Sequence, residues 1–234
     1  PFARDLKLDS DLRMTTEHEW YRESAVKAVI AEAGINAPLT ELLTAACEQL
    51  LDDEARWDPA LPLSELGKEL DKESSIAPLA ALHGMDAETV MALTEGLRKE
   101  TGAYERAAQS LGKRIVEGIQ AAGITPEELA GGKNGYHSFF RKLAAFGDEW
   151  LEPSATARKA FDNDKLGSGK IKGAAVAALE ELGPHLHAWF AEANELLALG
   201  QLDHFVRAAV LRELPSAFAL IELDRSLRML KEAD

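Results

Sequence analysis

The chain has 234 residues, of which 46% are apolar and 28% charged, and it carries a formal net charge of −14. This length allows one large domain or two small ones with a proper core, and the composition is that of an ordinary soluble globular protein. The excess of acid argues against tight non-specific binding to nucleic acid or to an anionic membrane over most of the surface.

Targeting and redox features are sparse. No apolar run approaches the roughly 18 residues that a membrane span needs, and no signal peptide is recognisable. The single cysteine, Cys47, cannot form an internal disulfide, and its place in the apolar run LLTAACEQLL predicts a buried, inert thiol. We therefore expect a cytoplasmic protein without membrane contact. Because the first residue is Pro1 and the chain reads as already under way, we also expect a fragment of a longer protein.

Nearly the whole chain is predicted to be helical, since it is rich in Ala, Leu and Glu and lacks alternating β-branched runs. A capping box of Thr16 and Glu19 begins a helix that ends near Gly34. Pro38 opens the next helix, to about residue 55, with its apolar side chains on one stripe. A turn over 56–62, a short helix over 63–70 and a cap at Asp86 follow. We expect the stripe of the 38–55 helix to be Leu39, Leu42, Leu43, Ala46, Leu50 and Leu51.

The longest predicted helix runs from Asp86 to Gly123, because its apolar residues follow each other at spacings of three, four or seven. At 1.5 Å per residue it is a rod of roughly 55 Å, typical of an antiparallel helical hairpin or a coiled-coil-like arm. The alternative is two shorter helices broken near Thr101 and Gly102. The apolar positions are Val90, Leu93, Leu97, Tyr104, Ala108, Leu111, Ile115, Ile119 and Ala122.

Beyond Gly123, Thr125 and Pro126 predict a capped helix start that leads into Gly131 and Gly132. Further helices are expected over 171–183, from Pro184 to 199, over 203–214 and over 216–230, with breaks or kinks at Pro184 and Pro215. No repeat or domain boundary is visible. The predicted fold is all-α: a single domain over residues 1–234, a helical bundle with one long helix or helical-hairpin arm.

Residues 131–175, which we call the basic window, depart from the acidity of the chain. Eight lysines and arginines stand against five carboxylates, so the window carries +3 and the rest of the chain −17. The window is also rich in glycine and aromatic residues. Basic charge, bendable backbone and flat side chains suit contact with a polyanion. The alternative is a long solvated loop between helices.

Motifs for catalysis, metals or nucleotides are missing from the sequence. The run Gly167-Ser168-Gly169-Lys170 fails as a phosphate loop, because Asp164 and Ile171 stand where the pattern needs Gly and Ser or Thr, and no apolar strand precedes it. No carboxylate pair is set apart for acid–base work. We therefore predict no catalytic residue, no metal site and no cofactor in this chain.

Three stretches resemble the UvrD/RecB-like superfamily 1 helicases, in particular RecB-type helicase-nuclease chains. They are PFARDLKLDSDLRMTTEHEWYRESAVKAVIAEAG at the start, ITPEELAGGKNGYHSFFRKL with EPSATARKAF in the middle, and IELDRSLRMLKEAD at the end. The first is similar to the segment after the T-x-H-S-F-F motif of the motor core, the second to a block inside an inserted accessory subdomain, and the third to the helix before the core resumes.

The resemblance implies a 1B-type accessory insertion that guides DNA to the motor. ATP and Mg²⁺ would be bound by the parent's motor core, because the Walker A lysine, the D-E-x-Q-D strand and the arginine finger are not in this chain. The partners implied are DNA, the motor lobes of the same polypeptide and a nuclease or helicase subunit. An insertion also predicts that the two chain ends lie close together in space.

The basic window supplies the candidate DNA contacts. Lysines and arginines can reach phosphates, Gly131 and Gly132 allow close backbone approach, and Tyr136 can stack on an exposed base. Phe139 and Phe140 are expected in the core. About three neutralised phosphates predict a salt slope of only about −2.7 and hence weak binding. The cationic candidates are Lys133, Arg141, Lys142, Arg158, Lys159, Lys165, Lys170 and Lys172. The competing hypothesis is a helical module that docks a partner subunit or the motor lobes without touching DNA.

Overall fold

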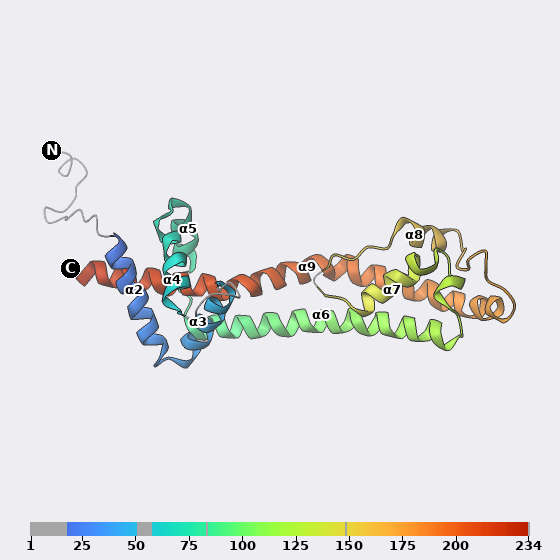
Figure 1. The fold of residues 1–234 in the computed structure, drawn as a ribbon, viewed down its shortest axis with the longest axis horizontal. Helices are drawn as coiled ribbons and strands as arrows, with labels where there is room; N and C mark the ends of the chain where they lie inside the picture. The colour runs from blue at the N-terminus through green and yellow to red at the C-terminus, as the bar shows by residue number, and fades with distance from the viewer. Residues whose placement is uncertain (1–17, 51–57, 83, 148, 234) are drawn as a thin grey trace. The chain divides into compact units, whose positions relative to one another are not determined.

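The computed structural model describes residues 18–50, 58–82, 84–147 and 149–233, and these residues form an all-α protein, as predicted (Figure 1). The first half contains α2 (His18–Ala33), α3 (Ala37–Leu50), α4 (Ala60–Gly67), η1 (Lys68–Asp71), α5 (Glu73–Leu82) and α6 (Ala87–Ala121). The second half contains η2 (Pro126–Glu128), η3 (Gly132–Asn134), α7 (Tyr136–Ala144), α8 (Ala155–Asp162) and α9 (Ala174–Ala233). Among the described residues, no helix has both the length and the apolar character needed to cross a lipid bilayer.

The chain divides into two compact units where the sequence suggested one domain. Unit 1 comprises residues 1–94 and 212–234, and unit 2 comprises residues 95–211. Both dividing points fall inside helices, since α6 and α9 each contribute to both units. Because neither helix is interrupted there, the sequence offers no linker or change of composition that marks the division.

Unit 1 has its own apolar core. Asn36 caps α3 by accepting a hydrogen bond from the Leu39 backbone N–H at 3.2 Å, and Pro38 occupies the first turn. The predicted stripe of α3 is buried at Leu39, Leu42, Leu43 and Ala46; the Leu50 side chain and Leu51 lie outside the described residues. The expected burial of Cys47 is confirmed, and burial raises the pKa of its thiol. The core residues are Val26, Val29, Leu39, Leu42, Leu43, Ala46, Cys47, Leu63, Val90, Phe218, Ala219 and Leu223.

Within unit 2, α6 and α9 lie side by side and antiparallel (Figure 1). The Tyr104 hydroxyl donates a hydrogen bond to the Leu196 carbonyl at 3.2 Å, and Arg114 pairs with Glu192 at 2.5 Å. Glycines let the helices approach each other closely, because a Cβ at Gly200 would lie 2.4 Å from the Tyr104 ring. The hairpin-like arrangement expected of the long helix is therefore made with α9.

The two longest helices are less interrupted than the sequence suggested. α6 continues through Thr101 and Gly102, so the alternative of two shorter helices is wrong. α9 runs for 60 residues through Pro184 and Pro215, where we expected breaks. A proline inside a helix removes one backbone hydrogen bond and crowds the preceding turn. Leu186 follows Pro184 and Phe218 follows Pro215, and both side chains are buried, so burial of these side chains can offset the cost of each proline.

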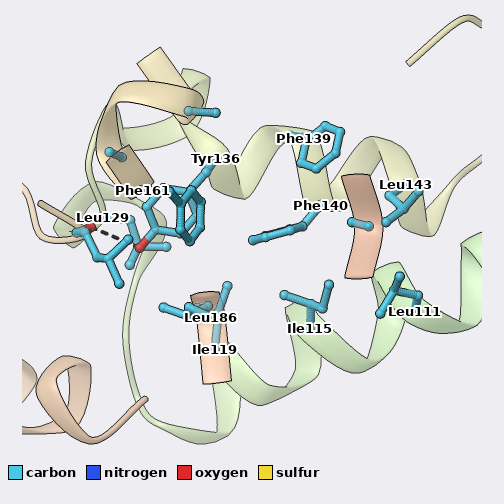
Figure 2. Close-up of a cluster of buried hydrophobic side chains, with 14 of the residues drawn as sticks. Leu111, Ile115, Ile119, Leu129, Tyr136, Phe139, Phe140, Leu143, Phe161 and Leu186 are labelled. Carbon is cyan, nitrogen blue, oxygen red and sulfur yellow. Dashed lines mark hydrogen bonds between the residues drawn. The ribbon is translucent and has the colours of Figure 1, made fainter. Parts of the chain in front are cut away.

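The core of unit 2 is completed by α7 and α8, which pack on α6 and α9 (Figure 2). Phe139 and Phe140 are buried, as expected. The rings of Phe161 and Phe190 stack with their centroids 3.9 Å apart. Ser154 caps α8 by accepting a hydrogen bond from the Ala157 backbone N–H at 3.1 Å. The basic window is therefore not one long solvated loop, because α7 and α8 within it contribute to the core, although the segments between its helices are irregular.

Candidate nucleic-acid interface

The segment that leads into the basic window is a series of tight turns. The Glu128 carboxylate accepts hydrogen bonds from the backbone N–H and the hydroxyl of Thr125, both at 2.8 Å, and these bonds lower the pKa of Glu128. The expected helix start thus forms only one turn, η2. Gly131 and Gly132 then adopt positive φ angles of 78° and 57°, which side chains rarely tolerate.

The two glycines differ in what surrounds them. A Cβ at Gly131 would lie 2.7 Å from the Gly135 Cα, so the packing of the turn itself requires glycine. At Gly132 nothing lies within 4 Å of that position. Of the two proposed points of backbone approach, only Gly132 faces open space.

Tyr136 is a correction to the sequence analysis. Its side chain is 0% exposed, and its hydroxyl donates a hydrogen bond to the Leu166 carbonyl at 2.9 Å (Figure 2). Its ring packs edge-on against Phe161 with centroids 5.1 Å apart. The prediction that Tyr136 stacks on an exposed base is therefore wrong. Tyr136 is the first residue of α7, and its ring belongs to the apolar face that α7 buries in the core of unit 2.

A loop that is distant in sequence is pinned beside these turns. The Ala130 N–H donates to the Leu166 carbonyl and the Ser168 N–H to the Glu128 carbonyl, both at 2.8 Å. The Ser168 hydroxyl donates to the Glu127 carbonyl at 2.9 Å and accepts from the Lys170 N–H at 3.2 Å. The run Gly167-Ser168-Gly169-Lys170, which does not match the phosphate-loop pattern, thus joins two parts of the fold, and the Ser168 hydroxyl is hydrogen-bonded within the protein.

All eight cations of the basic window are exposed. Three of them have carboxylate partners: Lys133 with Glu127 at 3.4 Å, Arg158 with Glu152 at 3.3 Å and Lys142 with Glu149 at 3.9 Å. Exposed pairs of this kind contribute about 0–1 kcal/mol and exchange readily. Within the described part of the chain, no ion pair involves the other five: Arg141, Lys159, Lys165, Lys170 and Lys172.

Ion pairs and hydrogen bonds place several of these cations in two groups. Lys133 pairs with the Glu127 carboxylate, and the backbone N–H of Lys170 donates to the Ser168 hydroxyl, which itself donates to the Glu127 backbone carbonyl. The backbone N–H of Glu127 and the Lys133 ammonium lower the pKa of Glu127. Burial and the nearby Arg141 guanidinium lower the pKa of His137, whereas Glu127 opposes that effect. Lys133 is therefore the cation that contacts the Glu127 carboxylate, whereas Lys170 is joined to Glu127 through backbone groups and Arg141 through their shared neighbour His137.

The second group borders residues 149–153. Lys142 points to Glu149, and Arg158 contacts both Glu152 and the Pro153 carbonyl, the latter at 3.1 Å. Arg141 and Lys142 are consecutive on α7 and so lie on different sides of the helix. Among the described residues, no ion pair joins Lys159, Lys165 or Lys172 to either group.

A groove of about 890 Å³, which the sequence did not predict, opens beside the pinned loop. Its lining includes the glycines and Ser168 of the loop and the first turns of α9. His187 Nε2 lies 2.9 Å from Asp164 Oδ1, and the lining mixes Lys165 with the carboxylates of Asp164 and Glu180. This mixed charge gives the groove no clear preference for an anion. In the described ranges no three His, Cys, Asp or Glu side chains are placed to hold a metal ion.

Comparisons with models of protein families, with curated proteins and with solved structures gave no match to this chain. The resemblance to helicase accessory subdomains therefore stays a prediction from the quoted motifs. Its expectation that the two chain ends lie close together involves Pro1, which lies outside the described residues.

Proposed function

We propose that unit 2 binds the phosphate backbone of DNA weakly through its basic window, as the non-catalytic accessory domain of an ATP-dependent DNA helicase. The observation that carries this proposal is that the charged side chains of the window are exposed while most of its aromatic side chains are buried. The cations are exposed, whereas Tyr136, Phe139, Phe140 and Phe146 are buried. Among the described aromatic residues of the window only Trp150 is exposed, so the surface offers mainly charge to phosphates, and we expect binding that is largely independent of sequence.

The group around Glu127 is the best candidate for phosphate contact. Lys133 and Lys170 come from segments that the loop contacts bring together, and Arg141 lies close by. Lys133 can exchange the Glu127 carboxylate for a DNA phosphate at little cost in free energy, because the ion pair between Lys133 and Glu127 is long and exposed to solvent. Three phosphate contacts give a salt slope of about −2.7 on duplex DNA, which means weak binding by the isolated chain.

In this proposal the chain takes no catalytic step. The motor lobes of the parent polypeptide would bind ATP and Mg²⁺ and pull the strand, and the acidic remainder of the chain would keep DNA from binding elsewhere on it. A nuclease or partner helicase subunit belongs to the same proposal. Its support is the motif resemblance together with the exposed cations.

The test is fluorescence anisotropy of labelled forked DNA at low salt with paired neutralisations. Lys133→Gln/Lys170→Gln removes two charges from the group around Glu127. Lys68→Gln/Lys72→Gln removes two exposed charges from unit 1, where each lysine pairs with a nearby glutamate. We expect the first variant to raise the Kd at least fivefold and the second to leave it within twofold. Equal binding by the first variant and the wild type contradicts the proposal.

A second candidate function, a protein-docking module, is favoured by a different observation: apolar side chains that α9 leaves exposed in unit 2. This surface lies outside the basic window.

A further inference from the structure

One face of α9 in unit 2 is apolar yet exposed. Leu199 is 78% exposed, Leu202 66%, Val206 53% and Val210 43%. These residues follow each other at spacings of three, four and four, so they lie along one side of the helix. We call them the α9 stripe. On the opposite side Gln201 and His204 are buried, so the exposed side is the one that α9 does not use for packing in unit 2.

The α9 stripe borders a groove of about 380 Å³ between α6 and α9. Tyr104, Leu196, Leu199 and Gly200 line its apolar part. The groove depends on Gly200, because a Cβ there would lie 2.4 Å from the Tyr104 ring and force the two helices apart. An apolar side chain from outside can therefore rest on an aromatic floor next to Leu199.

Single exposed apolar residues are normal on a protein surface, but a contiguous row beside a groove is typical of an interaction site. The geometry matches helix-in-groove recognition, in which anchors at i, i+3 or i+4, and i+7 fill such a surface.

Charge identifies the kind of partner. Between residues 174 and 211, α9 carries five carboxylates and one basic residue, Arg207. The Arg207 guanidinium is already held by Glu100 at 2.6 Å and by Asp203 at 2.7 Å. Glu192 and Glu195 border the groove; Glu192 pairs with Arg114, whereas Glu195 has no ion pair among the described residues. A second copy of α9 would bring acid against acid, so a basic partner fits better.

We propose that the α9 stripe and its groove bind a basic amphipathic helix of a partner protein. Apolar residues of that helix cover Leu199, Leu202 and Val206, and a lysine or arginine on its flank pairs with Glu195. The inference uses residues outside the basic window and does not depend on DNA binding, so each proposal can fail without the other.

The probe is a synthetic 21-residue helix with leucines at i, i+3 and i+7 and lysines on both flanks, labelled for anisotropy and titrated with the whole chain at about 100 mM salt. Two comparison peptides keep its length: one has glutamates on the flanks, and the other has the same composition in scrambled order. We expect the basic amphipathic peptide to bind at least tenfold more tightly than either. A Kd above 1 mM for this peptide, or equal binding of the scrambled one, overturns the proposal.

Variants of the chain separate docking from general attraction between charges. Leu202→Glu/Val206→Glu makes α9 more acidic, so attraction by charge alone would strengthen binding, whereas docking on the α9 stripe predicts at least a tenfold loss. Glu192→Gln/Glu195→Gln is expected to lose binding severalfold. Glu180→Gln/Glu181→Gln removes two exposed carboxylates elsewhere on α9 and is expected to change nothing. Tighter binding by Leu202→Glu/Val206→Glu refutes the docking site.

Sedimentation of the whole chain tests whether a second copy of the chain covers the α9 stripe instead. Circular dichroism checks that each variant is folded. We expect the wild-type chain to sediment as a monomer at 50 µM. A dimer that dissociates in Leu202→Glu/Val206→Glu would mean that a second copy covers the α9 stripe, and it would overturn the proposal. Because all the substituted side chains are exposed, the substitutions leave the core of unit 2 intact.

Discussion

The packing of α7 on α6 gives a prediction in which one substitution has opposite effects at two places on the same helix. Gly112 lies where the end of α7 meets α6, and a Cβ there would be 2.2 Å from the Ala144 backbone nitrogen and 2.6 Å from the Leu143 carbonyl carbon. Gly96 lies in the same helix and the same unit, with nothing within 4 Å of the same position.

The magnitudes follow from two competing effects. Replacing a helical glycine by alanine stabilises by about 1 kcal/mol, because alanine loses less backbone entropy on folding. Overpacking costs about 1–3 kcal/mol, and the upper end applies at Gly112 because the obstructing atoms are backbone and cannot rotate away. We therefore expect Gly112→Ala to lower the free energy of unfolding by about 2 kcal/mol, and Gly96→Ala to raise it by about 0.8 kcal/mol.

Urea unfolding followed by far-UV circular dichroism measures both free energies, and peptide-resolved hydrogen exchange locates the change. In Gly112→Ala the amides of α7 are expected to exchange faster, while those of α2 to α4 in unit 1 keep their wild-type rates. If Gly112→Ala stabilises the chain as Gly96→Ala does, α7 does not sit against α6 at this glycine, and the packing described for unit 2 is refuted.

Three further predictions concern buried and capping groups. Burial raises the pKa of the Tyr136 phenol well above the value of about 10 in unfolded chains, so the folded state keeps this proton longer. The contribution of Tyr136 to the unfolding free energy is then constant below about pH 10 and falls as pH rises above it. Tyr136→Phe removes this contribution to the fall, and absorbance at 295 nm follows the ionisation. Cys47 is expected to react with Ellman's reagent at least 100-fold more slowly in the folded protein than in urea; equal rates contradict its burial. Ser154→Ala removes the N-cap of α8 and is expected to lower the free energy of unfolding, measured in urea, by about 1 kcal/mol. Ser154→Asp retains a capping oxygen and is expected to keep most of this stability.

Much of the fold follows from local patterns. Asn36 and Pro38 mark the start of α3, and the spacing of Leu39, Leu42 and Leu43 identifies its buried face. The run of apolar residues from Val90 to Ile119 predicts one long helix, and α6 has nearly the expected bounds. These inferences succeed because capping and helical periodicity involve residues within a few positions of each other.

The candidate sites were predicted less completely. The exposure of the lysines and arginines agrees with the sequence, since charged side chains stay in water wherever the backbone allows it. Composition could not show that Tyr136 is buried, because a tyrosine in a basic segment suits a base-stacking surface and a core equally well. The contact of Ser168 with Glu127 spans 41 residues, and no local signal announces it.

The sequence alone determined that this chain is helical, acidic and locally basic over residues 131–175, because propensity and charge belong to each residue wherever it lies. The tertiary structure decided which apolar faces are covered. Leu186 and Leu202 both lie on apolar stripes of α9, yet the first is buried against α7 and α6 and the second is open to solvent. Periodicity shows that a helix has an apolar side, but only its packed neighbours determine whether that side is buried.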